Sequence, residues 1–176
     1  MSEAIRKTYV IEWQGPFTLK EINEIKDKKS SGSLYLVSGL QRYQHGESVI
    51  QYIGISSRGA AIRFKDKGHK GELVQRERQY WLGHITNASE KNRDNLELAE
   101  HVLIYTCKAP LNKNKKDNAP HEPAIIANRW LNKTGDTYRQ RRLWPVQKDV
   151  PDIILFDGDH VWTCDSLKWR PELKSE

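Results

Sequence analysis

The chain has 176 residues, 37% of them hydrophobic and 30% charged, and a mean hydropathy of -0.79. This length predicts one domain with extensions and a substantial core. The composition excludes membrane-spanning helices, because no stretch approaches the roughly 20 apolar residues that a bilayer requires, and the charged first residues predict no signal peptide. Because Cys107 and Cys164 are the only cysteines, we expect a reducing cytosol and neither a disulfide framework nor a thiolate metal cluster.

Basic residues exceed acidic ones by 29 to 23, which gives a net charge of +6. A basic protein is a candidate for nucleic-acid binding, because its cations release the counterions of the phosphate backbone. The cations also cluster: residues 58–78 hold seven of them against three carboxylates, and shorter clusters lie at 113–116 and 139–142. Each cluster alone is typical of a solvated face, so charge indicates a class of partner and no more.

The first part of the chain predicts a strand followed by a short helix. Residues 8–14 are rich in β-branched and aromatic side chains, which is typical of a strand, and Gly15-Pro16 predicts a turn. Thr18 and Glu21 have the spacing of a capping box ahead of a helix. A polar loop follows.

The middle of the chain predicts a hairpin, a helix and a further strand. The apolar runs 33–40 and 48–56 have the composition of two strands joined by a fairly long connection. Residues 58–67 follow without a helix breaker, so we expect a helix there. Residues 80–86 are typical of a third strand.

The remaining segments complete an α+β order of elements. Residues 94–107 form the clearest helical pattern in the chain, with Pro110 just beyond its end. A polar linker covers 112–120, and 122–132 predicts another helix with a proline in its first turn. Residues 152–164 predict a hairpin around an Asp-Gly turn.

A period of two along the first hairpin predicts which side chains share a face. In one register Tyr35 and Tyr52 lie on the same side of the sheet. The opposite, core-facing side then holds Leu34, Leu36, Ile53 and Ile55. Gly54, beside Tyr52, leaves room for a close approach by backbone or ligand. Two tyrosines on adjacent strands are by themselves typical of cross-strand packing.

Two charged residues accompany the tyrosines. Arg63 lies on the helix expected after the hairpin, where an arginine is usually a surface residue. Glu100 falls on the apolar face of the helix at 94–107, with Leu96 and Leu103 as neighbours. A carboxylate there is costly unless it is paired or binds a metal. A glutamate at the edge of the stripe that reaches water is the alternative.

Together these residues resemble the GIY-YIG nuclease family, which is named for two short strand motifs. The first motif is degenerate here, SLYLV around Tyr35, and the second is intact as Tyr52-Ile53-Gly54. Arg63 follows at about the family's distance, and Glu100 lies on a late helix that ends in a Pro-x-Asn-like stretch. Asn112 occupies the position of the family's asparagine.

The resemblance covers about residues 32–112, roughly half of the chain. It implies a small three-stranded antiparallel sheet flanked by helices. Residues 1–31 and 113–176 would then be N- and C-terminal extensions, the second able to contact DNA.

The resemblance also implies a metal-dependent hydrolysis of DNA phosphodiesters. Glu100 would hold one divalent ion, Mg²⁺ or Mn²⁺. Tyr35 would orient or deprotonate the attacking water, while Tyr52 and Arg63 would hold the scissile phosphate. Asn112 would brace the site.

Two of the site assignments stay open. Either Lys67 or His69 would assist proton transfer, because the family carries a histidine or lysine one turn after its arginine. Glu122, with Asn132 ten residues later, repeats the design of Glu100 and ranks second as the metal ligand. For contacts to the DNA backbone we expect five cations: Arg58, Lys70, Arg139, Arg141 and Arg142.

The C-terminal segment is rich in tryptophan. Residues 130–169 hold four of the six tryptophans, namely Trp130, Trp144, Trp162 and Trp169. These side chains could stack on nucleic-acid bases, but we expect most of them to be buried in the core of the C-terminal segment.

Several functions fit this sequence. A sequence-specific restriction enzyme in the cytosol is the most specific, and a symmetric target would call for a homodimer. A repair or mobile-element nuclease is a close alternative. A nucleic-acid-binding protein without turnover and a basic α+β domain with an unrelated partner are the others.

Overall fold

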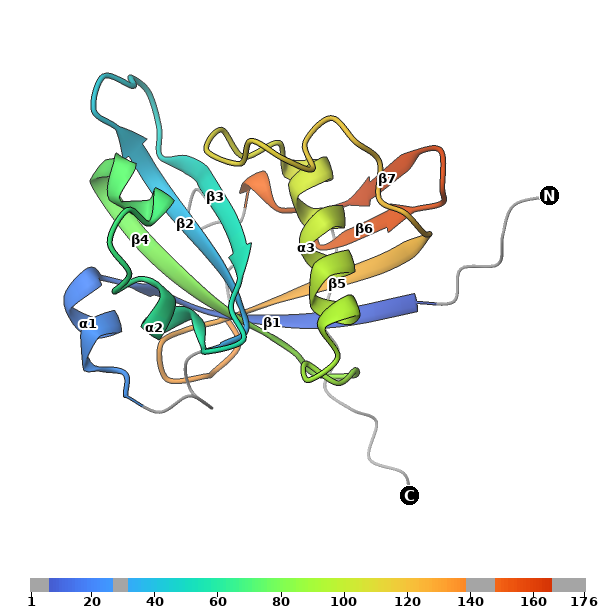
Figure 1. Ribbon diagram of the computed structural model, residues 1–176, viewed down its shortest axis with the longest axis horizontal. Helices are drawn as coiled ribbons and strands as arrows, with labels where there is room; N and C mark the ends of the chain where they lie inside the picture. Colours follow the sequence, from blue (N-terminus) through green and yellow to red (C-terminus); the bar gives the residue numbers. More distant parts are fainter. Residues whose placement is uncertain (1–6, 27–31, 139–147, 166–176) are drawn as a thin grey trace.

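The computed structural model describes residues 7–26, 32–138 and 148–165. These residues form one sheet, in which the strands lie in the order β3-β2-β4-β1-β5-β6-β7 (Figure 1). The strands are β1 (Lys7–Phe17), β2 (Leu34–Gln41), β3 (Val49–Ile55), β4 (Val74–Ile85), β5 (Ala124–Leu131), β6 (Ile153–Phe156) and β7 (Val161–Cys164). The helices are α1 (Leu19–Glu24), α2 (Ala60–Arg63), the 3₁₀ helix η2 (Lys70–Leu73) and α3 (Arg93–Cys107). Within the described ranges, no helix is long and apolar enough to cross a membrane.

The first strand lies in the middle of the sheet. On one side β1 pairs with β4 in the antiparallel direction, and on the other it runs parallel to β5, with Lys7 opposite Ala124 and Gln14 opposite Leu131. The other neighbouring strands pair in the antiparallel direction. The sheet is therefore mixed, and it joins segments from both ends of the chain.

The expected small three-stranded sheet is wrong. Strands β2, β3 and β4 do pair with one another, but they form only one half of a seven-stranded curled sheet with few helices. The segments expected to be extensions contribute β1, β5, β6 and β7 to that same sheet. The alternating apolar side chains of β1 and β5 explain this, because each strand can bury one row of side chains only inside a larger sheet.

The helix expected over 122–132 is the strand β5. Every second residue from Ala124 to Trp130 is buried, which is the period of a strand. One of the buried positions is the polar Asn128, so the apolar alternation is interrupted in the sequence. The alanines, leucine and arginine of this segment are good helix formers, which is why the sequence alone predicts a helix here.

Other elements follow the sequence more closely. The capping box of Thr18 and Glu21 is present at the start of α1. The β2–β3 hairpin, the β6–β7 hairpin and α3 are confirmed. The turn expected at Gly15-Pro16 is wrong, since β1 continues through it to Phe17, and the helix expected over 58–67 shortens to the four residues of α2.

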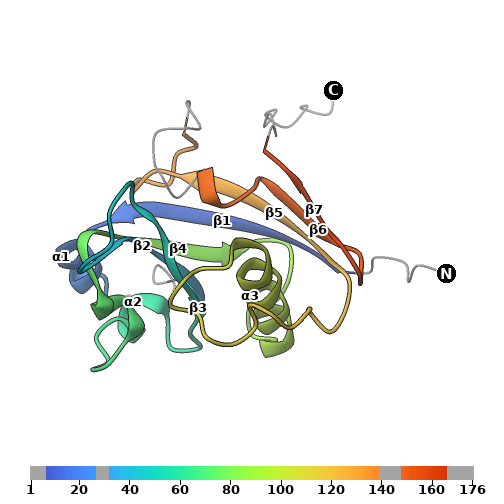
Figure 2. The same ribbon diagram turned by 90° about the horizontal axis from the view of Figure 1, so that it is seen from above.

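The curl of the sheet separates two hydrophobic cores (Figure 2). Helix α3 lies inside the curl, contacts β3, β5 and β6, and contributes Leu98 and Leu103 to the first core. On the opposite face of β2 and β4, the helices α1 and α2 cover a second core around Tyr35 and Phe64. Strand β3 is the free edge of the sheet at which these two sides meet.

A buried asparagine joins the two halves of the sheet. Asn128 on β5 accepts a hydrogen bond from the Trp13 indole on β1, at 2.8 Å. Its amide nitrogen donates to the carbonyl oxygen of Pro151, also at 2.8 Å, and its side chain is almost inaccessible. Asn128 thus fixes β5 against β1 and against the approach to β6.

We expect Asn128→Ala to lower the free energy of unfolding by about 2–3 kcal/mol, because it leaves a buried indole N–H and a carbonyl without partners. Urea denaturation checks this. Asn23→Ala, at an exposed position of α1, is the control and should stay within about 0.5 kcal/mol of the parent protein. Equal stability of the two variants would contradict this role for Asn128.

Candidate functional site

The β2–β3 hairpin brings the two predicted tyrosines together. Tyr35 lies opposite Gly54 and Val37 opposite Tyr52, so both phenol rings lie on one face with their centroids 6.0 Å apart. A Cβ atom at Gly54 would lie 2.5 Å from the Tyr35 ring. The glycine of the Tyr52-Ile53-Gly54 motif is therefore what allows the Tyr35 ring to lie across β3.

His69 completes the buried part of the site. Its Nε2 lies 3.1 Å from the Tyr35 hydroxyl, and its Nδ1 accepts a hydrogen bond from the backbone N–H of Gly71 at 2.9 Å. Because Nδ1 is an acceptor, the proton of the neutral ring is on Nε2, which donates to Tyr35. Of the two residues left open, His69 is buried and contacts Tyr35, whereas Lys67 is exposed.

The second phenol lies beside this hydrogen bond. The Tyr35 hydroxyl, which accepts from His69, interacts with Tyr52, whose ring centroid lies 6.0 Å from that of Tyr35. Tyr35 is 1% exposed, whereas Tyr52 is half-buried. Of these two phenols, Tyr52 is therefore the one that a substrate reaches more easily.

Burial controls the protonation of both tyrosines. It raises the pKa of Tyr35 far above its ordinary value, and the neighbouring Tyr52 and the charge of Glu100 raise it further, against the opposing effect of Arg63. Burial and Glu100 also raise the pKa of Tyr52. Both phenols therefore keep their protons at neutral pH in this state, so Tyr35 is not poised to deprotonate a water in the free protein.

Arg63 ends α2 beside the tyrosines. Its guanidinium lies 2.5 Å from the Asp66 carboxylate, which also binds Arg58 at 2.5 Å, and it interacts with the Tyr35 hydroxyl. The Asp66 hydrogen bond and these charges raise the pKa of Arg63. The side chain is 41% exposed, so an anion can reach this cation from solvent.

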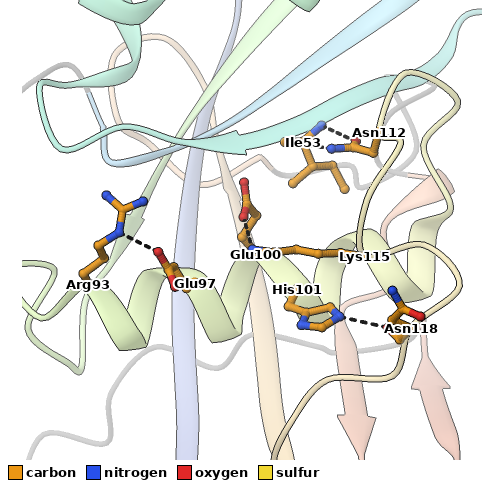
Figure 3. Close-up of polar contacts among 8 residues, drawn as sticks. All are labelled: Ile53, Arg93, Glu97, Glu100, His101, Asn112, Lys115 and Asn118. Carbon is orange, nitrogen blue, oxygen red and sulfur yellow. Dashed lines mark hydrogen bonds and ion pairs between the residues drawn. The ribbon is translucent and has the colours of Figure 1, made fainter.

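Glu100 projects from α3 toward the edge strand β3 (Figure 3). Its side chain is 13% exposed, and its carboxylate lies 2.6 Å from the ammonium of Lys115. The cost of placing a carboxylate on an apolar helix face is thus offset by an ion pair. One turn earlier, Glu97 pairs with Arg93 on a more exposed part of the same helix.

Asn112 closes the edge of β3. Its amide oxygen accepts from the Ile53 N–H and its amide nitrogen donates to the Ile53 carbonyl, both at 2.9 Å (Figure 3). Next to it, the Leu111 N–H donates to the carbonyl of Gln51 at 2.9 Å. The segment after α3 therefore replaces a neighbouring strand at the residues that carry Tyr52 and Gly54.

The second candidate glutamate lies elsewhere. Glu122 pairs with Lys7 at 2.6 Å, at the start of β1, and its charge acts on Tyr9. Asn132 caps a turn by accepting from the Thr134 and Asp136 N–H groups. Glu100, by contrast, is the carboxylate whose charge acts on both phenols.

One carboxylate, that of Glu100, is available for a divalent ion beside the phenols. Among the described residues there is no group of three or more His, Cys, Asp or Glu side chains that could hold a metal. Mg²⁺ keeps several waters and is often held by one or two carboxylates together with substrate phosphates. The half-buried Glu100 carboxylate, which already holds a cation in the form of an ammonium, fits that mode.

The predicted DNA contacts are placed only in part. Arg58 is 60% exposed at its side chain and shares Asp66 with Arg63, and Lys70 begins η2. The other predicted contacts lie outside the described residues: Arg139, Arg141 and Arg142.

The tryptophans divide between core and surface. Trp130 is buried against Trp13 and Trp81, as expected for a core residue. Trp162 on β7 is 59% exposed. Trp144 and Trp169 lie outside the described part of the chain.

The site is built around one edge of the sheet. Its residues come from β2, β3, α2, the segment before η2, α3 and the loop that follows α3. Lys115 pairs with Glu100, a role that the sequence did not single out; its place in the basic cluster at 113–116, soon after the end of α3, was the one available signal. Comparison of the chain with family models, with curated proteins and with solved structures finds no match.

We expect Gly54→Ala to destabilise the protein by about 1–3 kcal/mol, since its methyl group would overlap the Tyr35 ring. A double-mutant cycle with Tyr35→Leu, measured by urea denaturation, tests the cause. In the leucine background the same alanine should cost clearly less. An unchanged cost would mean that the overlap with Tyr35 is not what excludes a side chain at this position.

The stability of the protein should depend on pH through His69. Burial and the nearby Arg63 lower the pKa of His69 to about 4, from an ordinary 6.5. Between these values the unfolded chain binds a proton that the folded chain does not, so stability decreases as the pH falls through this window, by roughly 3 kcal/mol, and this contribution levels off below about pH 4.

Urea denaturation between about pH 7 and about pH 4 measures this dependence. His69→Gln keeps a hydrogen-bond donor and removes the titrating ring, so its stability should vary less with pH than that of the parent protein. Two parallel profiles would show that His69 does not carry the effect.

Proposed function

We propose that this chain is a metal-dependent DNA endonuclease of the GIY-YIG type, which hydrolyses phosphodiester bonds. The observation that carries the proposal is the contact of Tyr35 with both His69 and Tyr52, at one sheet edge together with Arg63 and Glu100. Each of these residues was expected at the site from the sequence. Their gathering there is hard to explain by packing alone, because it buries polar groups next to charges.

Arg63 and Tyr52 are the groups that meet the phosphate. Arg63 offers a guanidinium that is partly open to solvent, and such a cation binds phosphate oxygens by charge-assisted hydrogen bonds. Tyr52, the more exposed of the two phenols, can direct its proton to a water or to a phosphate oxygen. We therefore assign the contact with water and phosphate to Tyr52.

Tyr35 and His69 support that contact. His69 donates to Tyr35 from Nε2, so it cannot take the proton of Tyr35 through that nitrogen in this tautomer. Its donated hydrogen bond instead fixes the orientation of the Tyr35 hydroxyl, and it would stabilise negative charge that develops there during the reaction. Preorganised donors of this kind need no rearrangement when charge develops.

Glu100 is the residue that would hold the divalent ion, with Asn112 fixing the strand opposite it. The bound ion would supply neutralisation of charge on the phosphate oxygens. Glu100 also keeps negative charge beside the two phenols, which raises their pKa values in the free protein.

DNA as the substrate rests on charge. The chain carries a net charge of +6, and seven cations lie within residues 58–78, around α2 and η2 beside the site. Two cysteines, Cys107 and Cys164, are too few for a disulfide framework, and we propose a cytosolic location. A restriction enzyme is the specific version of this function, and a symmetric target would then require two copies of the chain.

A nucleic-acid-binding protein without turnover is the second candidate. It is favoured by one observation, the neutralisation of Glu100 by Lys115 at 2.6 Å. Both functions predict DNA binding that weakens with salt. They differ in whether metal produces cleavage.

We expect the protein to cleave supercoiled plasmid in Mg²⁺ and to leave it intact in EDTA. Glu100→Gln and Tyr35→Phe should each reduce the rate by at least about 10²–10³-fold, with DNA binding in a gel shift largely retained. Glu97→Gln is the matched control, because it removes a carboxylate one turn away on the same helix. Cleavage retained in Glu100→Gln would exclude this site, and binding without any cleavage by the parent protein would favour the second candidate.

A further inference from the structure

Lys115 occupies the place where Glu100 would hold a metal ion. Its ammonium lies 2.6 Å from the Glu100 Oε2, and the two side chains are 31% and 13% exposed (Figure 3). An ion pair with this degree of burial is screened much less by salt than one at the surface. The carboxylate and the ammonium together carry no net charge, so the pair attracts a divalent cation far less than a free carboxylate would.

The loop that carries Lys115 is attached to α3 at several points. Asn118 accepts a hydrogen bond at its carbonyl oxygen from His101, with the two atoms 2.9 Å apart, and Lys108 donates to the Lys116 carbonyl. Lys115 itself has a φ of +67°, a left-handed conformation that is uncommon for a residue with a side chain. The position of the ammonium is thus fixed by the fold of residues 108–118.

Glu100 and Lys115 have different preferred partners once a phosphodiester is present. A phosphate oxygen is a ligand for a magnesium ion and an acceptor for an ammonium. A bound strand would therefore supply a second anionic oxygen for the ion and an alternative anion for Lys115. When Glu100 binds the ion and Lys115 binds the phosphate, both charged side chains keep a partner of opposite charge. The metal alone would leave Lys115 without an anion, and the nucleic acid alone would leave Glu100 without a cation.

We propose that Lys115 withholds Glu100 from the divalent ion until a nucleic-acid phosphate takes over the ammonium, so that metal and nucleic acid bind cooperatively. This inference rests on the proposed function, because it takes Glu100 as the metal ligand. It makes Lys115 a positioning residue for the metal. With this role for Lys115, the ion pair between Lys115 and Glu100 is compatible with an active enzyme.

The test is a calorimetric titration with Mn²⁺ in the absence of nucleic acid. Lys115→Met should bind Mn²⁺ at Glu100 at least about tenfold more tightly than the parent protein, and Lys115→Gln should change the affinity in the same direction. Lys113→Met, in the same loop, should bind as the parent does. Thermal unfolding of each variant establishes that it is folded.

A second titration adds an oligonucleotide duplex in the Tyr35→Phe background, in which we expect cleavage to be at least about 10²–10³-fold slower. The duplex should increase the Mn²⁺ affinity of the parent site markedly and that of Lys115→Met much less, since linkage makes the coupling reciprocal. Unchanged or weaker Mn²⁺ binding by both Lys115 variants would overturn the inference and leave the proposed function standing. If Glu100→Gln does not reduce Mn²⁺ binding in the Lys115→Met background, Glu100 is not the metal ligand and the proposed site itself fails.

Discussion

The paired hydrogen bonds between the Asn112 amide and the backbone of Ile53 hold the site together. Strand β3 is an edge strand, and its outer backbone groups would otherwise be open to water or to another chain. The asparagine satisfies both groups of one residue, and this residue lies between Tyr52 and Gly54. Because Asn112 follows α3 closely, the same contact fixes that helix, and with it Glu100, beside the edge strand. A substitution of Asn112 would therefore disturb the positions of both Tyr52 and Glu100.

The arrangement explains why the site draws on two different cores. Tyr35 and His69 belong to the core under α1 and α2, whereas Glu100 extends from the helix inside the curl. Only at a free edge can side chains from opposite faces of a sheet approach one another, because elsewhere the backbone separates them. The site therefore has a dry part, which fixes hydrogen bonds, and a wetter part that carries the charges.

The sequence was informative about the site because its signals are local. The period of the hairpin predicted that Tyr35 and Tyr52 share a face, and the helical period singled out Glu100 as a carboxylate on an apolar face. The choice between Lys67 and His69 could be made only from the structure, because it depends on which of the two side chains is buried after α2. The partner of Glu100 was hidden for the same reason, because a loop must reverse its direction to bring Lys115 back over the helix.

The overall sheet was not predictable in the same way. Strand β5 contains a buried asparagine, Asn128, which interrupts the alternation of apolar side chains. The period of two becomes recognisable only when the hydrogen bond from the Trp13 indole to Asn128 is known. The mixed pairing of β1 also depends on residues far away in sequence. Local patterns predict the strands β2, β3 and β4, but they cannot reveal that four other strands belong to the same sheet.

The central position of β1 has a consequence for how the protein folds. Strands β2, β3 and β4 are close in sequence, whereas β1 and β5 meet across long separations, 117 residues for Glu12 and Arg129. Such contacts raise the contact order, and closing so long a loop delays them during folding. During synthesis β1 emerges long before β5, so the pairing of these two strands can form only after residues 124–131 have been made. The hairpin with its two tyrosines can form earlier, but the helix that carries Glu100 acquires its full support only when both ends of the sheet have joined.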